Sequence, residues 1–449
     1  MNAWSLLRSL NRDQRNTFMA SFLGWTLDAF DYFLLTFVTI RIAGDFKVAV
    51  PAIALTLTLT LMMRPVGALI FGILAERFGR RIPLMVDIIC YSVIELLTAF
   101  SPNYTIFLIL RVLFGIAMGG EWGLGASLAM ESLPSQARGL FSGILQQGYA
   151  CGYLLGALVY FLVFNVLYVA FPSLLSFDWR TMFIIGVLPA LLVVFIRSQV
   201  PESPVWEHHQ AVRQEKGVSM WEGIWTAIIT RPWLFIYLIF LMTAFNSLSH
   251  GTQDLFPTFL QGQLKQGVGV TSTITIVANI GAIIGGTLFG YYSQYWGRRR
   301  AIIIACIVGI IMIPLWSGLL QIPGISMLVS IAAGAFLLQF MVQGAWGIIP
   351  AHLNELSPTD VRGTFPGFAY QLGNLLAAQV VLLESLLAQS LGSAKIANYS
   401  LALAIFSLGA FLAVIIFTAI GQEARGIDFM KTGSVESTEY SSSEVQPTD

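Results

Sequence analysis

Ionisable residues inside apolar stretches are the first candidates for chemistry in this sequence. Asp28 and Asp31 lie in the segment GWTLDAFDY at 24–32, and Arg64 lies in the next apolar stretch. A charge near the centre of a bilayer costs at least about 2.5–3.5 kcal/mol, so each one needs a partner or a purpose. Asp28 and Asp31 share one helix face and could form a structural ion pair with Arg64. We favour a role in binding an ion or small molecule, because central charges usually line a pathway through the membrane.

A polar stripe marks a later apolar stretch. Its residues recur at steps of three, one, three and one: Asn246, Ser249, His250, Gln253 and Asp254. At about 100° per residue they fall within a stripe about 140° wide. We expect the stripe to face water or a bound molecule, although a hydrogen-bonded seam between helices would show the same pattern. His250 and Asp254 are one turn apart and suit proton handling. Two such ligands do not close a metal site, so no metal is expected.

Long apolar helices must position these residues. The chain is 56% hydrophobic and 11% charged, whereas soluble domains carry about 25% charged residues. Uncharged stretches of about 20 residues match the length of a helix that crosses a bilayer. The sequence therefore predicts an all-α integral membrane protein with twelve helices, at 18–42, 52–75, 83–101, 105–130, 140–164, 178–197, 232–260, 272–293, 300–320, 325–352, 364–391 and 397–420.

The positions of Lys and Arg predict the orientation. With a cytoplasmic N-terminus, 17 of the 24 basic residues fall in inner segments and five in outer loops. The positive-inside rule then places both termini in the cytoplasm of a multi-pass protein of the cell membrane, or of the inner membrane in a Gram-negative bacterium. The predicted divisions are a cytoplasmic N-terminal segment (1–17), a six-helix bundle (18–197), a cytoplasmic linker (198–231), a second six-helix bundle (232–420) and a disordered cytoplasmic tail (421–449).

Composition excludes several classes of function. The net charge is zero and the basic residues are scattered, so no nucleic-acid partner is expected. Cys90, Cys151 and Cys306 occur singly, without the spacing of a metal or redox pair, and no cofactor is expected. An intramembrane hydrolase would need paired catalytic groups such as HExxH or GxSxG, and neither motif occurs. We therefore predict that the protein is not an enzyme.

Internal repetition relates the two halves. GILAERFGRR at 72–81 returns as GYYSQYWGRR at 290–299. A second set recurs 224 positions later with the same residue types: Trp122, Gly123, Glu131, Pro134, Arg138, Gly139, Gly143 and Gln147. Such repeats are typical of transport folds built from two pseudo-symmetric bundles.

The repeated segments resemble the loop signature of the major facilitator superfamily, G-x-x-x-D-R-x-G-R-[RK]. The resemblance covers about 18–420 and implies two six-helix bundles that rock about a central site. The signature aspartate is Glu76 in the first half and Gln294 in the second, so a charge interaction is kept in one and lost in the other. The gating residues that the resemblance implies are Gly72, Glu76, Arg77, Gly79, Arg80, Arg138, Arg298 and Arg362.

Further polar residues share helix faces. The segment from Arg111 to Glu121 resembles the fourth-helix signature of that superfamily, and Arg111 could line a cavity or serve close packing. For Glu121 a proton-linked role and a contact at a helix end are both open. Gln371 and Asn374 share a face of the eleventh predicted helix and are candidate substrate contacts.

The stripe at 246–258 carries a narrower resemblance. It matches N-x-x-[ST]-H-x-[ST]-Q-D-x-x-x-T of the Jen-type lactate and pyruvate proton symporters, which belong to the sialate:proton symporter family. The resemblance implies that Asn246, His250 and Asp254 are needed for transport, that Arg64 recognises a carboxylate, and that Gln253 and Thr258 complete the motif. The centre is a short polar linker, without the extra helices of bacterial sialic acid porters, which argues against sialate.

These residues together predict proton-coupled symport of a small monocarboxylate. The expected partners are a small organic anion, a proton and the lipid bilayer, with no obligate protein partner. Substrate contacts are assigned to Arg64, Asn246, His250, Gln253, Gln371 and Asn374, and proton coupling to Asp28, Asp31, Glu121, His250 and Asp254. The alternatives are symport of another organic anion (a dicarboxylate, sialate or an aromatic acid) and a nutrient sensor without flux.

Overall fold

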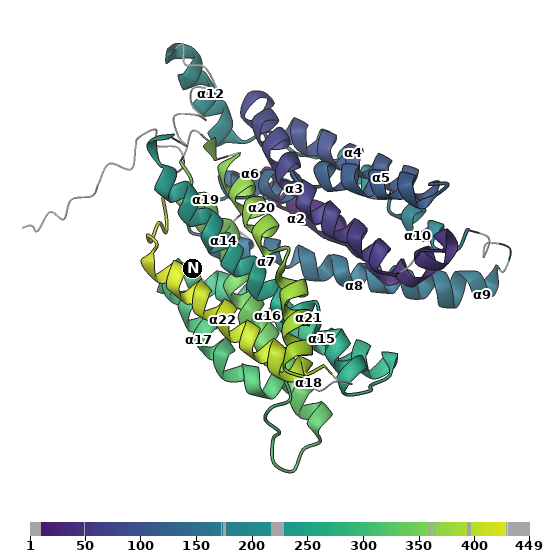
Figure 1. Cartoon of the computed structure of the whole chain (residues 1–449). Helices are drawn as coiled ribbons and strands as arrows, with labels where there is room; N and C mark the ends of the chain where they lie inside the picture. Colours follow the sequence, from purple (N-terminus) through teal and green to yellow (C-terminus); the bar gives the residue numbers. More distant parts are fainter. Residues whose placement is uncertain are drawn as a thin grey trace, which may run out of the picture.

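The computed structural model describes residues 10–48, 50–171, 173, 177–216, 229–358, 361–362, 364–392, 397–427 and 429. Every regular element among them is a helix, and the helices form two bundles, one from each half of the chain (Figure 1). Ten helical segments in these ranges are long and apolar enough to cross a membrane. The predicted all-α membrane fold is confirmed.

Several membrane-spanning segments of the first bundle are divided into two or more shorter helices. Its elements are α2 (Arg12–Phe46), α3 (Val50–Phe78), α4 (Arg81–Ala99), α5 (Tyr104–Ala117), α6 (Glu121–Ser132), α7 (Arg138–Gln146), α8 (Gly148–Phe161), the π-helical turn η1 (Leu162–Leu167), α9 (Tyr168–Ala170), α10 (Arg180–Ile185) and α11 (Ala190–Gln199). Helix α12 (Pro204–Lys216) occupies part of the predicted linker, and 217–228 lie outside the described residues.

The second bundle repeats this plan. Its elements are α14 (Pro232–Gln253), α15 (Phe256–Thr258), the π-helical turn η3 (Phe259–Gln263), α16 (Val268–Trp296), α17 (Arg298–Trp316), α18 (Met327–Trp346), α19 (Ile349–Leu356), α20 (Phe365–Ala377), α21 (Val380–Ser390) and α22 (Tyr399–Ile420). The predicted helix 232–260 is interrupted, because the chain turns at Asp254 and Leu255 before α15. The predicted tail beyond Phe429 lies outside the described residues.

Local capping residues start several of these helices. Asn11 accepts a hydrogen bond of 2.8 Å from the backbone of Gln14 at the start of α2, and Gln14 reciprocates in a capping box. Asn103 and Ser326 cap α5 and α18 by accepting from the backbone N–H groups of Ile106 and Val329. Such caps satisfy backbone N–H groups that have no partner within the helix.

The outer faces of both bundles are apolar. Val194 on α11 and Ile311 on α17 are 67% and 63% exposed. A soluble protein would bury such side chains, whereas a lipid-facing helix presents them to hydrocarbon. The exposed apolar belt is therefore the surface that meets the bilayer.

The two bundles converge at one end of the molecule and diverge at the other (Figure 1). We call the end where α2 begins, α12 lies and α22 finishes the linker side. Here α3 packs on α20, α7 packs on α16, and α6 approaches α20. A Cβ on Gly123 would lie 2.9 Å from the Cα of Gly367, so these helices touch backbone to backbone. The linker side is closed.

Candidate functional site

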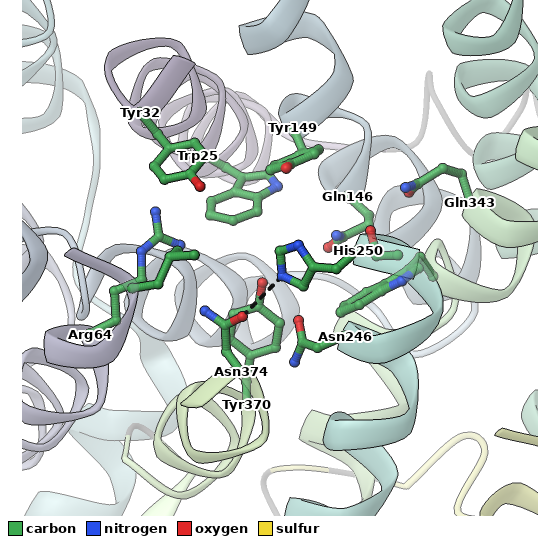
Figure 2. A pocket seen from close by; sticks show the side chains of 13 residues that line it. Trp25, Tyr32, Arg64, Gln146, Tyr149, Asn246, His250, Gln343, Tyr370 and Asn374 are labelled. Carbon is green, nitrogen blue, oxygen red and sulfur yellow. Dashed lines mark hydrogen bonds between the residues drawn. The ribbon is translucent and has the colours of Figure 1, made fainter. Parts of the chain in front are cut away.

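A cavity lies between the two bundles. Its inner part, of about 40 Å³, is lined by residues of both halves, including Arg64, Tyr149, Asn246, His250, Tyr370 and Asn374 (Figure 2). A larger part of about 430 Å³ shares Tyr32, Leu61, Tyr149 and His250 with it. Thr58, near the start of α3, and Phe256, beyond the end of α14, line this larger part, which therefore extends away from the linker side.

Arg64 supplies the cationic wall of the inner cavity. Its Nη2 lies 3.5 Å from Oδ2 of Asp28 and 3.1 Å from Sδ of Met118, and its guanidinium lies 5.5 Å from the ring centroid of Tyr32. At 3.5 Å the contact with Asp28 is a loose ion pair rather than a bidentate one. The planar fork of Arg64 thus retains donors for an anion in the cavity.

His250 lies across the cavity from Arg64, on α14 (Figure 2). Its Nδ1 is 3.0 Å from Oδ2 of Asp254, and its Nε2 is 3.3 Å from Oδ1 of Asn374 on α20. As the Asn374 amide is oriented here, both partners present an oxygen to the ring, and a protonated imidazole would donate to both. Loss of that proton obliges one contact to break or Asn374 to turn its amide. The arrangement therefore links the charge of His250 to the wall of the cavity.

The other predicted substrate contacts divide into two groups. Asn246 lines the inner cavity and donates to the backbone oxygen of Met242 at 2.9 Å. Gln253 lines the larger part, and its Nε2 donates to Oε1 of Gln339 at 3.1 Å. Gln371 is fully buried behind Asn374, and it is not among the residues that line either part. Its assignment as a direct contact is not supported by this geometry.

The predicted proton-coupling acids of the first half lie behind the cavity wall. Asp28, Asp31 and Glu121 are all buried, at no more than 1% exposure. The carboxyl oxygens of Asp31 and Glu121 have no hydrogen-bond partner within the described residues. Glu121 packs its carboxyl against Gly24 of α2, one turn from Asp28. Asp28 and Glu121 thus lie near Arg64, whereas Asp31 lies toward Glu95 and Arg111.

Arg111 does not line the cavity. Its Nη2 donates to Oε2 of Glu95 at 2.9 Å, and its guanidinium lies 3.8 Å from the ring centroid of Phe114. The face of α5 that carries Arg111 is turned toward α4, inside the first bundle. A helical wheel shows which residues share a face but not which neighbour that face meets, so both roles were left open for Arg111, and its contacts favour close packing.

Aromatic residues complete the cavity wall, and most of them were not predicted from the sequence. Trp25 and Tyr149 have ring centroids 6.0 Å apart, while Tyr370 stacks on Trp122 at 4.4 Å. Gln146 was missed as well, although it shares a face of one membrane-spanning segment with Tyr149. The available signal was the recurrence of Trp25, Asp28 and Tyr32 along α2 at helical spacing.

The first gating motif forms a buried ion network on the linker side. Arg80 lies 3.4 Å from Glu76 and 3.2 Å from Glu131, and its backbone N–H donates to Glu202 at 2.8 Å. Burial alone would lower the pKa of Arg80, but the carboxylates of Glu131 and Glu76 outweigh it and hold that pKa above its usual value. Gly79 adopts φ 88°, which favours glycine, beside Glu202.

The second motif builds the same network with fewer charges. Arg298 donates to Glu355 through two bonds of 2.9 and 3.0 Å and to Gln294 at 2.8 Å. Its backbone N–H donates to Glu423 at 3.0 Å, as that of Arg80 does to Glu202. Gln294 thus keeps a hydrogen bond where the charge is lost.

The remaining motif residues also lie on the linker side. A Cβ on Gly72 would meet Thr364 of the other half at 2.8 Å, so Gly72 permits the closed contact. Arg77 is exposed and stacks on Phe78 at 5.1 Å. The equivalent residues Arg138 and Arg362 both stack on Phe429, at 3.4 and 3.8 Å from its ring centroid.

Comparison with known proteins identifies the family. Residues 18–380 match the Major Facilitator Superfamily, so the chain belongs to this family. A carboxylic acid transporter protein homolog of Saccharomyces cerevisiae is 30% identical over 85% of this chain, which spans 62% of that protein's length. A probable 4-methylmuconolactone transporter of Cupriavidus pinatubonensis is 27% identical over 100% of this chain and 99% of its own.

Solved structures show the same fold. The proton:xylose symporter XylE is 19% identical and superposes with a TM-score of 0.73 over 93% of this chain and 98% of its own. The human organic anion transporter MFSD10 superposes with a TM-score of 0.66 over 91% of this chain, at 15% identity.

Proposed function

We propose that this protein is a proton-coupled symporter of small monocarboxylates such as lactate or pyruvate. The observation that carries the proposal is that Arg64 and His250, from different halves, face one cavity. Arg64 offers the planar donors that suit a carboxylate. His250 offers a proton site beside the same anion.

The size of the inner cavity favours a small anion. A cavity needs about 10–15 Å³ to hold one water molecule. The inner part, at about 40 Å³, therefore has room for about three water molecules. A monocarboxylate of a few heavy atoms fills such a space. The yeast relative is named for carboxylic acid transport, which supports this substrate class.

Electrical energy explains why a proton should accompany the anion. A monocarboxylate entering a negative-inside cell works against about 2.3 kcal/mol per charge per 100 mV. A bound proton cancels that charge. His250 with Asp254 and Asn374, and Asp28 beside Arg64, are the groups that would hold this proton.

Alternating access follows from the packing of the halves. The positive-inside rule places the linker side in the cytoplasm, so the closed linker side and the cavity on the other side correspond to an outward-facing state. An anion held between Arg64 and His250 would draw the halves together on the open side. A ligand shifts an equilibrium only between states that it binds with different affinity. The contact of the anion with both Arg64 and His250 would differ between the outward-facing and inward-facing states.

Transport by the full chain in proteoliposomes tests the proposal. Labelled lactate should accumulate when the outside is made acidic, and His250→Ala should abolish this accumulation. His208→Ala, which changes an exposed histidine of α12, is the matched control and should accumulate lactate normally. Accumulation that ignores the pH gradient, or survives His250→Ala, would refute the proposal.

Symport of a larger organic acid is the second candidate. The outer part of the cavity, at about 430 Å³, can hold a ring, and one full-length relative is named for 4-methylmuconolactone. Competition against labelled lactate by unlabelled acids of increasing size separates the two. Stronger competition by an aromatic acid or a sialate than by pyruvate would favour the second candidate.

A further inference from the structure

The first bundle buries more carboxyls than its cations can pair. The acids, each at 0–1% exposure, are Asp28, Asp31, Asp87, Glu95 and Glu121. Arg64 lies 3.5 Å from Asp28, and Arg111 lies 2.9 Å from Glu95. Three carboxyls remain without an ion pair in the described part of the chain. Charging each of them within a bilayer would cost at least about 2.5–3.5 kcal/mol, so burial favours the form of each carboxyl that carries a proton.

These acids form a column along the bundle. Asp31 interacts electrostatically with Glu95 and Asp28, Glu121 with Asp28, and Asp87 with both Glu121 and Asp28. On α4, Asp87 lies nearer the linker side than Glu95, by about 12 Å at 1.5 Å per residue. The column therefore continues from Asp28 past Glu121 to Asp87, toward the linker side.

A buried hydroxyl accompanies the column. Tyr91 interacts electrostatically with Asp28, Asp31, Asp87 and Glu121, and its fully buried hydroxyl has no hydrogen-bond partner among the described residues. The carboxyl oxygens of Asp87 and Glu121 have none either. Buried polar groups are normally paired, and a proton on one carboxyl makes it a donor to the next. No group of three or more His, Cys, Asp or Glu side chains in the described ranges could hold a metal ion.

We propose that Asp28, Glu121 and Asp87 form a proton route inside the first bundle that reaches the linker side without crossing the substrate cavity. Each transfer breaks an O–H bond on one carboxyl and forms one on the next, once side-chain rotation or a water molecule brings the two into contact, since none of the three acids accepts a hydrogen bond from Tyr91 in this state. None of these three acids lines the cavity. Besides the acids and Tyr91, the groups that face Asp87 are Cys90 and Arg64. This inference rests on the proposed proton symport and assigns a role to Asp87 on α4.

Asp87→Asn in proteoliposomes tests the route. Exchange of labelled for unlabelled lactate at equal pH needs no net proton movement and should be retained. Accumulation driven by one pH unit should fall about tenfold, since one proton per anion supplies about 1.4 kcal/mol per unit. Asp87→Glu should restore accumulation. Thr98→Val, a buried polar-to-apolar change on the same helix, should transport as wild type does.

Two outcomes separate the route from the symport itself. If the wild-type protein accumulates lactate and Asp87→Asn does so equally, the route is refuted while the symport stands. If the wild-type protein accumulates no monocarboxylate, the symport fails.

The infrared carbonyl band of protonated carboxyls still tests Asp87 in that case. An Asp87→Asn protein should lose part of that band, and an unchanged band overturns the assignment. Glu121→Gln repeats both measurements if Asp87→Asn does not fold.

Discussion

Arg64 on α3 and His250 on α14 line the same inner cavity although they belong to different halves of the chain (Figure 2). The repeat that builds the scaffold does not extend to these residues, because the equivalent helices of the two halves carry different polar groups. A bound carboxylate would contact a permanent cation on one wall and a protonatable ring on the other.

Replacing Arg64 should weaken substrate binding. Hydrogen bonds to a charged group contribute about 1.5–3 kcal/mol, so Arg64→Lys, which removes the bidentate fork but keeps the charge, should raise KM for lactate by about tenfold or more. Initial-rate measurements over a range of lactate concentrations check this. Arg41→Lys changes an exposed arginine that pairs with Asp178 and should leave KM unchanged. A wild-type KM for Arg64→Lys would exclude Arg64 as the carboxylate contact.

Removing the anion beside His250 should uncouple proton movement from transport. Asp254→Asn keeps the side-chain shape but replaces the carboxylate that lies 3.0 Å from Nδ1 with a neutral amide. We expect exchange of lactate to continue while accumulation under a pH gradient declines. Measuring both in the same vesicles distinguishes a coupling residue from a packing residue, because a packing defect would lower exchange and accumulation together.

Arg111 should prove structural where Arg64 is functional. Arg111→Ala leaves Glu95 buried without its cation, and breaking such a pair costs about 3–5 kcal/mol. The double variant Arg111→Met with Glu95→Leu should recover stability, since apolar residues of similar size can replace a buried pair. Thermal unfolding in detergent measures this. Recovery of Tm together with a wild-type KM is expected, whereas a raised KM in the stable double variant would restore a cavity role for Arg111.

Separating the halves on the linker side should shift the protein toward an inward-facing state. Gly123→Leu adds a side chain at a position where even its first carbon, the Cβ, would lie 2.9 Å from the Cα of Gly367. Ser142, buried against Gly347 of the other half, should then become accessible. Alkylation of Ser142→Cys in a background without native cysteines measures the change. Gly44→Leu, at an open position on α2, is the control and should leave alkylation unchanged.

The sequence was sufficient to predict the bundles, their repeat and the polar stripe of α14, because hydropathy and helical periodicity act locally. It predicted Arg64 as a partner of both aspartates of α2, and the 3.5 Å contact to Asp28 agrees, whereas Asp31 makes no ion pair with Arg64 among the described residues. It could not show that Arg111 turns toward Glu95, or that Gln371 lies behind Asn374, since such contacts depend on how helices rotate against each other. Asp87 escaped notice because one acid near a helix start gives no pattern.

Simultaneous recording of lactate uptake and external pH in proteoliposomes tests the central claim most directly. The protein should remove about one proton from the medium for each lactate that enters, because only a neutral pair avoids the cost of about 2.3 kcal/mol per charge per 100 mV. His250→Ala should abolish both signals under a pH gradient. Lactate uptake that leaves the external pH unchanged would contradict proton-coupled monocarboxylate symport.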